Sequence, residues 1–404
     1  MKRALPLVIA LCVIIALGAE VVRLRRELPS PKPARELPTG AYRPGISAEL
    51  ERELERLATL GYVAGSERAP RTTGVLTYDK GAAFPGLTLF TCGGIPEALL
   101  IDMEGNVVYS WSAPGAMYWA RAFAMPNGDL LAIACNPAYM MKLDKDSHVI
   151  WRFEGKAHHD FAVMADGSTY VLVRETVMRP DMRGGAPLLD DCVVLLDPMG
   201  RELSRVSLLE AFQRTEMGRQ WLADHPLPQD ADLFHTNSIQ VLGSGRATHV
   251  LLSIRSIDTV AIVDLDAREI VWAMDGPWHM QHEAEFIGDR LLLFDNLGLS
   301  EELGSAGQSR VLEIDVRTRE LVWSYTAPGF FTHGAGAQQR LPNGNTLITE
   351  SISGRIIEVT PDGHIVWEYV NPLTLEDDPD IILAILRAER LPAGIARVWV
   401  AGLQ

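Results

Sequence analysis

Cysteine is scarce in this 404-residue chain, and its four cysteines form no Cys-x-x-Cys pair. Cys12 lies in an apolar segment, whereas Cys92, Cys135 and Cys192 are scattered along the rest of the chain. Redox and zinc-thiolate motifs need closely spaced cysteines, so their absence argues against both functions. One disulfide among the last three stays open, but small buried residues on strands are the better interpretation.

The chain also lacks an excess of positive charge. It has 37 Lys and Arg against 52 Asp and Glu, which gives a formal net charge of −15 and a pI of about 5.2. Proteins that bind nucleic acid usually present a basic surface, so we expect no nucleic-acid partner. A small anionic substrate remains possible, because a local positive site can work inside an acidic protein.

A long apolar run is missing as well, since the only candidate extends from Ala4 to Ala19. At about 1.5 Å per residue it falls somewhat short of a bilayer core of about 30 Å. Basic residues flank it on both sides. We interpret residues 1–26 as an uncleaved signal anchor, with a cleaved signal peptide as the alternative. The protein is then expected in the periplasm or another extracytoplasmic space, held at the inner membrane by this segment.

Residues 27–72 differ in composition from the longer segment after residue 72. They begin with several prolines, which is typical of an extended tether. Residues 48–60 then carry leucines at helical spacing, which predicts a short helix. This helix is expected to pack on the main domain or stand above the membrane, and a role as a partner helix is the alternative.

Six segments of the remaining chain repeat one pattern: an apolar strand, a turn usually built on Asp or Gly, and a second strand usually ending in Trp. They are ALLIDMEGNVVYSW, MMKLDKDSHVIW, VVLLDPMGRELSRV, VAIVDLDAREIVW, VLEIDVRTRELVW and IIEVTPDGHIVW. Self-similarity at a period of about 40–50 residues is a signature of radially repeated sheets. We therefore predict that residues 73–404 form an all-β, six-bladed β-propeller.

The repeat is uneven at its two ends. The first outer strand pair has no inner pair before it, and the last inner pair has no outer pair after it. Pairing of the N- and C-terminal strands would close the ring and remove its free edges. Two insertions interrupt the rhythm, one around 176–190 and a helix-like one around 207–231. Insertions on one face of a propeller commonly shape the binding mouth.

Histidine recurs at the start of the innermost strands. His159 and His235 each lie eight residues before a turn glycine, His282 lies six before one, and His333 lies eleven before one. Trp119 and Arg387 hold comparable places in the other two blades. Inner strands converge on the axis of a propeller, so these side chains are expected to face one central space.

A ring of imidazoles has three uses: binding a metal, binding an anion, or supplying a nucleophile with acid and base partners. Asp160 and Glu283 are expected to alternate away from the axis, which leaves the ring without carboxylate ligands. Arg255, on the strand expected to pair with that of His235, is expected to point toward the same mouth. An arginine disfavours a divalent cation and suits an anion with several oxygens, so we favour the anion and expect neither metal nor cofactor.

Several stretches resemble the bacterial arylsulfotransferase family. They are GVLTYDKGAAFPGLTLF, FHTNSIQVL, LLSIRSID, QHEAEFIGDRLLLFDN, QRLPNGNTLITES and GRIIEVTPDGHIVWEY, which together cover about residues 73–375. The resemblance implies a six-bladed propeller that moves a sulfuryl group from an aryl sulfate to a phenol. It also implies a sulfated histidine and ping-pong kinetics, with no nucleotide sulfate donor such as PAPS.

The same resemblance implies roles for individual residues. His282 of QHEAEF would be the nucleophile, and His235 and Asn237 of HTN would flank the sulfuryl group. Arg255 of SIRS would hold its oxygens, and His159 of HHD would complete the pocket. His235 is also the candidate to exchange a proton with the phenols.

The edge of this pocket is less determined by the motifs. The family's last blade contributes a small or polar residue, and Thr332 or His333 occupies that region. Trp119 and neighbouring aromatic residues are candidates to contact the phenol ring. His158, one residue from His159, is expected to face the opposite side of its strand.

Two other functions stay open for the sequence. The D-x-x-x-x-x-x-V-W pattern also resembles quinoprotein dehydrogenases, although those have eight blades and a carboxylate-bound calcium. A propeller can also serve as a non-catalytic binding module, since fold does not fix function. The natural donor, the natural acceptor and the oligomeric state are not determined by these motifs.

Overall fold

The computed structural model describes residues 52–53, 67–225, 231–243, 248–297, 308–392, 394 and 399. The predicted anchor (1–26) and most of the predicted tether and helix (27–72) lie outside these residues and stay predictions. Within the described part, no helix has the length and apolarity needed to cross a membrane. Cys92, Cys135 and Cys192 are free thiols.

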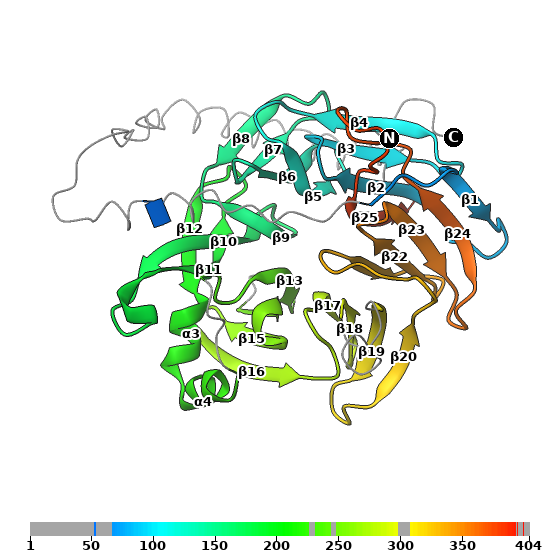
Figure 1. The fold of residues 1–404 in the computed structure, drawn as a ribbon. Helices are drawn as coiled ribbons and strands as arrows, with labels where there is room; N and C mark the ends of the chain where they lie inside the picture. Colours follow the sequence, from blue (N-terminus) through cyan, green and yellow to red (C-terminus); the bar gives the residue numbers. More distant parts are fainter. Residues whose placement is uncertain are drawn as a thin grey trace, which may run out of the picture. The chain divides into compact units, whose positions relative to one another are not determined.

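Six antiparallel sheets are arranged around one axis, which confirms the predicted all-β, six-bladed propeller (Figure 1). From the innermost strand outward, blade 1 is β25 (Ile385–Pro392), β2 (Gly86–Cys92), β3 (Glu97–Ile101) and β4 (Val107–Ser112). Blade 2 is β5 (Tyr118–Ala124), β6 (Leu130–Cys135), β7 (Tyr139–Leu143) and β8 (Val149–Phe153). Blade 3 is β9 (Ala157–Val163), β10 (Thr169–Met178), β11 (Pro187–Leu196) and β12 (Glu202–Ser207).

The other three blades follow in chain order. Blade 4 is β13 (Thr236–Leu242), β14 (His249–Ile254), β15 (Thr259–Asp264) and β16 (Glu269–Asp275). Blade 5 is β17 (His282–Ile287), β18 (Arg290–Asp295), β19 (Arg310–Asp315) and β20 (Leu321–Tyr325). Blade 6 is β21 (Ala337–Arg340), β22 (Thr346–Glu350), β23 (Arg355–Val359), β24 (Ile365–Val370) and β1 (Gly74–Tyr78).

Strands from opposite ends of the described chain pair in two blades. In blade 1, β25 is the innermost strand and runs antiparallel to β2, with Phe90 opposite Ala388. In blade 6, β1 runs antiparallel to β24 as a fifth, outermost strand. Blades 1 and 6 each combine early and late segments of the chain and lie side by side in Figure 1.

The repeated tryptophans link neighbouring blades. Each of four indole N–H groups donates to a turn carbonyl of the next blade: Trp111 to Gly128 (3.1 Å), Trp151 to Pro198 (3.1 Å), Trp323 to Pro361 (2.8 Å) and Trp367 to Met103 (2.9 Å). Beneath Trp151, Gly200 has φ +76°, and a Cβ atom there would lie 2.5 Å from the indole. Only glycine therefore suits that turn.

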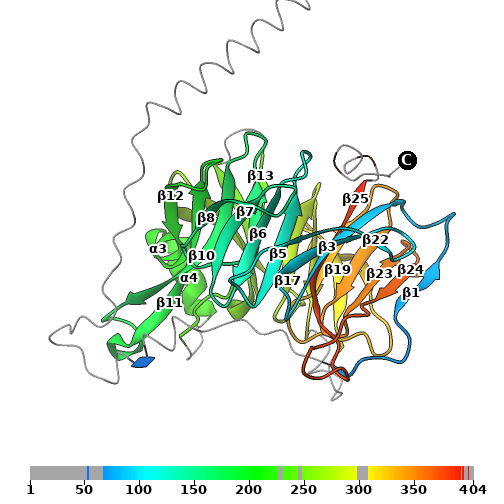
Figure 2. The same ribbon diagram turned by 90° about the horizontal axis from the view of Figure 1, so that it is seen from above.

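Both insertions lie where the inner strand of blade 3 begins. The first prolongs the β10–β11 hairpin past β9, because Val173 already pairs with Ala157, near the start of β9. The second forms α3 (Leu208–Arg214) and α4 (Glu216–Asp224), whose N-caps are Ser207 and Thr215. Figure 2 shows both helices beside this hairpin. The insertions thus extend the end of the propeller at which the inner-strand histidines lie.

Candidate functional site

Three of the predicted histidines come together from consecutive blades. His159 is near the start of β9, His235 directly precedes β13, and His282 begins β17. The ring centres of His159 and His235 are 5.0 Å apart. His282 is close enough to His235 and Arg255 for both positive charges to lower its pKa. The predicted group of His159, His235, His282 and Arg255 is therefore assembled in one place.

The backbone of this region is unusual. His159, His235 and Glu283 have φ values of +53°, +48° and +51°. A non-glycine residue in such a sparsely populated region costs about 1–3 kcal/mol and persists only where the surroundings fix it. Such residues cluster at functional sites, and these three lie at the entry of neighbouring inner strands.

Each imidazole of the cluster has a fixed partner on its Nδ1 atom. Nδ1 of His282 lies 2.7 Å from Oδ1 of Asn296 and 3.1 Å from the carbonyl oxygen of Met280. Both partners accept, so Nδ1 of His282 carries the proton and the lone pair is on Nε2. Nδ1 of His235 lies 2.8 Å from Oδ2 of Asp232, which places a proton on Nδ1 of His235 as well.

His159 is held by another histidine. Its Nδ1 atom is 2.8 Å from Nδ1 of His158, so the two rings share one proton. Oδ1 of Asp191 lies 3.3 Å from Nε2 of His158, at ion-pair distance and off the line of a hydrogen bond. His158 is buried against His159, which corrects the expectation that it faces away from it. The cause is the left-handed backbone at His159, which breaks the alternation of the strand.

Burial and neighbouring positive charge keep two of the rings neutral. Burial is the main cause that lowers the pKa of His282 to about 3, and the charge of Arg255 is the second. Burial, followed by the charges of His235 and His158, holds the pKa of His159 well below its usual range. Neutral His282 thus presents the lone pair of Nε2 near pH 7, as a nucleophile requires.

Two predicted pocket residues, Asn237 and Thr332, form hydrogen bonds that fix the surroundings of His282. Asn237 is buried and donates from Nδ2 to the carbonyl oxygen of Gln281 (2.7 Å), the residue before His282. Thr332 is fully buried, and its carbonyl oxygen accepts from Nδ2 of Asn296 (2.7 Å). Thr332 therefore fixes the side-chain amide of Asn296, and this amide in turn accepts from Nδ1 of His282. Asn237 ties blade 4 to the loop in front of the nucleophile.

Two predicted residues lie elsewhere. Trp119 is fully buried in an apolar cluster between blades 1 and 2. An irregularity in the pairing of β5 after Trp119 places Arg121 on the axial cavity instead. His333 is exposed, with its ring 6.3 Å from Phe331. The six inner-strand positions were predicted to face one central space, but Trp119 and His333 do not join the histidine cluster.

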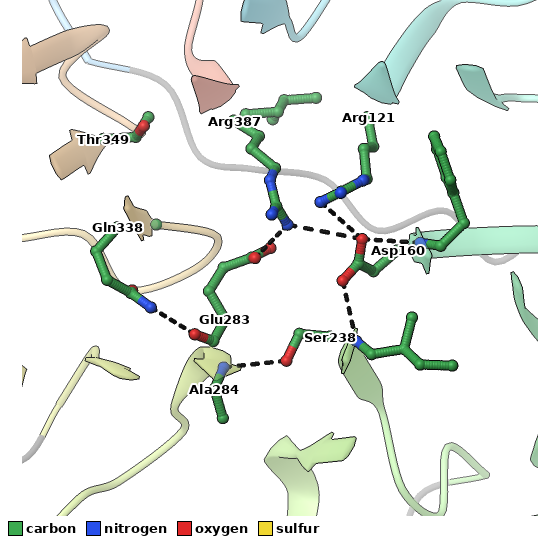
Figure 3. A network of polar contacts seen from close by, with 12 residues as sticks. Arg121, Asp160, Ser238, Glu283, Ala284, Gln338, Thr349 and Arg387 are labelled. Atoms are coloured by element: carbon green, nitrogen blue, oxygen red, sulfur yellow. Dashed lines mark hydrogen bonds and ion pairs between the residues drawn. The ribbon is translucent and has the colours of Figure 1, made fainter. Parts of the chain in front are cut away.

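Below the histidines, the axis is lined by charge. A cavity of about 280 Å³ is bordered by side chains that include Arg121, Asp160, Glu283, Gln338 and Arg387 (Figure 3). The expectation that Asp160 and Glu283 point away from the axis is therefore wrong. Pairing irregularities in β9 and β17, with positive φ at His159 and Glu283, turn both carboxylates inward.

Sequence reasoning missed the residues that hold the histidines. Asn296 directly follows strand β18, in the stretch LLLFDN, opposite the start of β17. Asp232 lies directly after the second insertion, three residues before His235. Arg174 lies in β10, directly after the part of this strand that pairs with β9, and contributes positive charge near His159. Asn296 could have been predicted from its position, because it is a polar residue directly after the second, buried strand of its blade.

Among the described residues, no group of three or more His, Cys, Asp or Glu side chains is arranged to hold an ion. The donors that do converge are imidazoles and a guanidinium, which suit an anion with several oxygens.

Comparison with known proteins identifies the chain's relatives. No curated protein matches it. A solved structure of a protein of unknown function from Bacteroides caccae is 12% identical, with a TM-score of 0.51, covering 76% of this chain and 98% of that one. A streptogramin B lyase structure is 13% identical, with a TM-score of 0.45, covering 83% of this chain and 99% of that one. At 12% identity, the likeness to the Bacteroides caccae protein shows the propeller fold alone.

A sequence model described as arylsulfotransferase (ASST) matches residues 121–372. This match spans more than half of the chain and contains His159, His235, Arg255 and His282. The protein therefore belongs to the arylsulfotransferase family.

Proposed function

We propose that this protein is an aryl-sulfate sulfotransferase that moves a sulfuryl group from an aryl sulfate to a phenol through a sulfated His282, without PAPS. The observation that carries the proposal is the state of His282. Its Nδ1 proton is held by Asn296, and its pKa is lowered by burial and by Arg255. A neutral imidazole beside a fixed guanidinium suits attack on an anionic sulfate ester.

In the first step, the Nε2 lone pair of His282 attacks the sulfur of the aryl sulfate. The N–S bond forms as the S–O bond to the aryl group breaks, and the electron pair leaves with the phenolate oxygen. That oxygen takes the proton from Nε2 of His235, whose Nδ1–H remains bonded to Asp232. Arg255 stabilises the charge on the three sulfuryl oxygens.

In the second step, the acceptor phenol gives its proton to Nε2 of His235, and its oxygen attacks the sulfur of sulfo-His282. The N–S bond breaks and returns its electron pair to Nε2, so both histidines regain their starting states. Protons balance over the two steps, and the reaction needs no cofactor. The predicted kinetics are ping-pong, because the donor phenol leaves before the acceptor reacts.

The Nδ1 partners support this division of roles. A carboxylate stabilises a protonated imidazole, so Asp232 suits a histidine that must carry a proton. A neutral amide stabilises a protonated imidazole less than a carboxylate does. Asn296 therefore leaves His282 available as a nucleophile. When His282 carries the sulfuryl group, its ring becomes cationic, and the bond from Nδ1–H to Asn296 strengthens.

The place of action is part of the proposal and rests on sequence alone. The basic and apolar N-terminal segment (1–26) favours an exported protein held at the inner membrane. Aryl sulfates and phenols are small molecules that such a protein can meet outside the cytoplasm.

A chromogenic assay tests the proposal. Nitrophenyl sulfate with added phenol should release nitrophenol at a rate that depends on the phenol, and His282→Ala should abolish this release. His364→Ala is a matched control, because His364 is an exposed histidine in a turn of blade 6 and should keep full activity. Release that is independent of phenol, or equal in His282→Ala and wild type, would contradict the proposal and favour a binding module.

A further inference from the structure

A series of ion pairs links inner strands around the axial cavity (Figure 3). Nη1 of Arg121 in β5 lies 2.7 Å from Oδ1 of Asp160 in β9. Nη1 of Arg387 in β25 lies 3.6 Å from the same oxygen and also contacts Oε2 of Glu283 in β17. The series thus joins the innermost strands of blades 1, 2, 3 and 5.

Each carboxylate of this series directly follows a histidine of the cluster. Asp160 follows His159 and also accepts from the backbone N–H of Ile239 in β13 (2.9 Å). Glu283 follows His282, and its carbonyl oxygen accepts from Nε2 of Gln338 in β21. Through these bonds the two residues connect the remaining blades, 4 and 6, to the same network.

The inner strands need such a connection because the axis is hollow at this level. The cavity of about 280 Å³ separates them, so apolar packing does not fix their mutual positions. Asp160 and Arg121 are only 2% and 8% exposed. Buried charges in contact hold a defined geometry, since losing one partner leaves the other uncompensated.

Arg387 reaches this network from β25, the late strand that pairs with β2 from the early part of the described chain. Its neighbour Ala388 donates its N–H to Oγ1 of Thr349 in β22 (3.2 Å), which ties β25 to blade 6. The residue lies beyond positions 121–372, which the family model matches. Burial raises the pKa of Glu283, and the charge of Arg387 opposes this increase.

We propose that Arg387 and Glu283 are positioning residues for His282, so that the closing strand β25 sets the geometry of the nucleophile. The inference rests on the proposed function. The contact fixes the side chain of Glu283, which directly follows His282 and has a left-handed backbone with φ +51°. Neither residue is assigned contact with the sulfuryl group.

Steady-state kinetics of Arg387→Gln and Glu283→Gln test the proposal, with nitrophenyl sulfate as donor and phenol as acceptor. Each variant should lower kcat about ten- to a hundred-fold while KM for the donor stays within about three-fold, since misplacement of a reacting group by about 1 Å can cost about 10²-fold. The double variant should be no worse than the poorer single variant, because it leaves no unpaired charge between the two positions.

Arg390→Gln is the matched control. Arg390 lies three residues further along β25 and forms a fully buried ion pair with Glu358 (3.1 Å), away from the cluster. Breaking this pair also disturbs the closing strand, but should leave kcat within about two-fold of wild type in protein that remains folded. Equal losses of kcat in Arg387→Gln and Arg390→Gln would overturn the proposal, because strand closure alone would then explain them.

Amide hydrogen exchange separates failure of this inference from failure of the proposed function. Arg387→Gln should speed exchange in the peptide that contains residues 280–286, about a hundred positions away in sequence, and Arg390→Gln should not. If wild-type protein transfers no sulfuryl group, the proposed function fails while this comparison still decides the positioning role. Unchanged exchange in that peptide of Arg387→Gln would overturn the positioning role even if transfer is observed.

Discussion

The partner on Nδ1 determines what each histidine of the cluster can do. His235 has a carboxylate, Asp232, beside its Nδ1 atom, whereas His282 has two neutral acceptors there, Asn296 and the carbonyl of Met280. Neither partner was visible as a motif, because Asp232 lies between the second insertion and β13, and Asn296 lies 14 residues after His282, directly after β18. The sequence could predict the histidines from their repeat position, but not the residues that assign their chemistry.

Replacing Asn296 should disturb the orientation and tautomer of the His282 ring while leaving His282 in place. In Asn296→Ala the Nδ1 proton loses its amide acceptor, and the ring can rotate or change tautomer. We expect kcat to fall roughly 10- to 100-fold, the range seen when a group that orients a histidine is lost. Steady-state kinetics with nitrophenyl sulfate measure this effect.

Asn371→Ala is the control for this variant. Asn371 is also buried and donates to the carbonyl oxygen of Leu383 (2.9 Å), away from the histidines. It should lose stability but keep kcat near wild type. Similar kcat values for Asn296→Ala and wild type would refute the orienting role of Asn296.

The low pKa of His282 predicts how stability depends on pH. The unfolded chain takes up a proton at this histidine below pH about 6.5, whereas the folded protein does so only near pH 3. His282 therefore lowers stability as the pH falls through this window, by about 2 kcal/mol between pH 7 and pH 5. Half-buried Glu283 and Glu285, whose pKa values desolvation raises to about 7, lower the free energy of unfolding as the pH rises.

Comparison with His282→Asn isolates this contribution. Urea unfolding of both proteins at pH 7 and pH 5 should show a smaller loss for the variant, by about 2 kcal/mol. An equal pH dependence of the two unfolding free energies would mean that His282 is protonated in the folded protein.

At the scale of elements, the outer-strand tryptophans connect neighbouring blades through hydrogen bonds from their indole N–H groups. The tryptophans were visible in the sequence, because they recur at the same strand end in five of the six repeated segments. The repeat could not predict the pairing irregularities in β9 and β17, since a bulge leaves no period of its own. These irregularities turn Asp160 and Glu283 to the axis, which explains why their orientation was predicted wrongly.

Replacing Trp367, which connects blades 6 and 1, should lower stability more than replacing a more exposed tryptophan of the same kind. The fully buried indole of Trp367 donates to Met103, stacks on Tyr369 at 6.0 Å and lies under the guanidinium of Arg390. Trp367→Ala should cost about 3–5 kcal/mol of unfolding free energy, as expected for a large core side chain. Trp323→Ala removes the same kind of link at a more exposed site and should cost less in the same urea titration.

At the scale of the whole molecule, the propeller combines both ends of the described chain in one ring. Six repeats were enough to predict the blade number, because each unit buries its faces only against neighbours. The ion pairs across the axis were not predictable, because Arg121, Asp160, Glu283 and Arg387 are neighbours only after the ring has formed. The site is therefore a property of the assembled ring as much as of its motifs.

Removal of the last strand should affect the whole ring. A chain that ends at residue 384 lacks β25, which leaves the edge of β2 unpaired and deletes Arg387. We expect it to lose the single cooperative thermal transition and to aggregate. A chain that ends at residue 392 keeps β25 and should unfold cooperatively, and a cooperative transition in the shorter chain would contradict this account.

The central claim, that His282 carries the sulfuryl group, is tested most directly by mapping the adduct. The protein is incubated with nitrophenyl sulfate without acceptor, quenched at alkaline pH, digested and sequenced by mass spectrometry. We predict one SO₃ group on the peptide containing residues 280–286, located at His282 and removed by added phenol. A sulfuryl group on another residue, or an unmodified His282 in protein that transfers the group, would contradict the account.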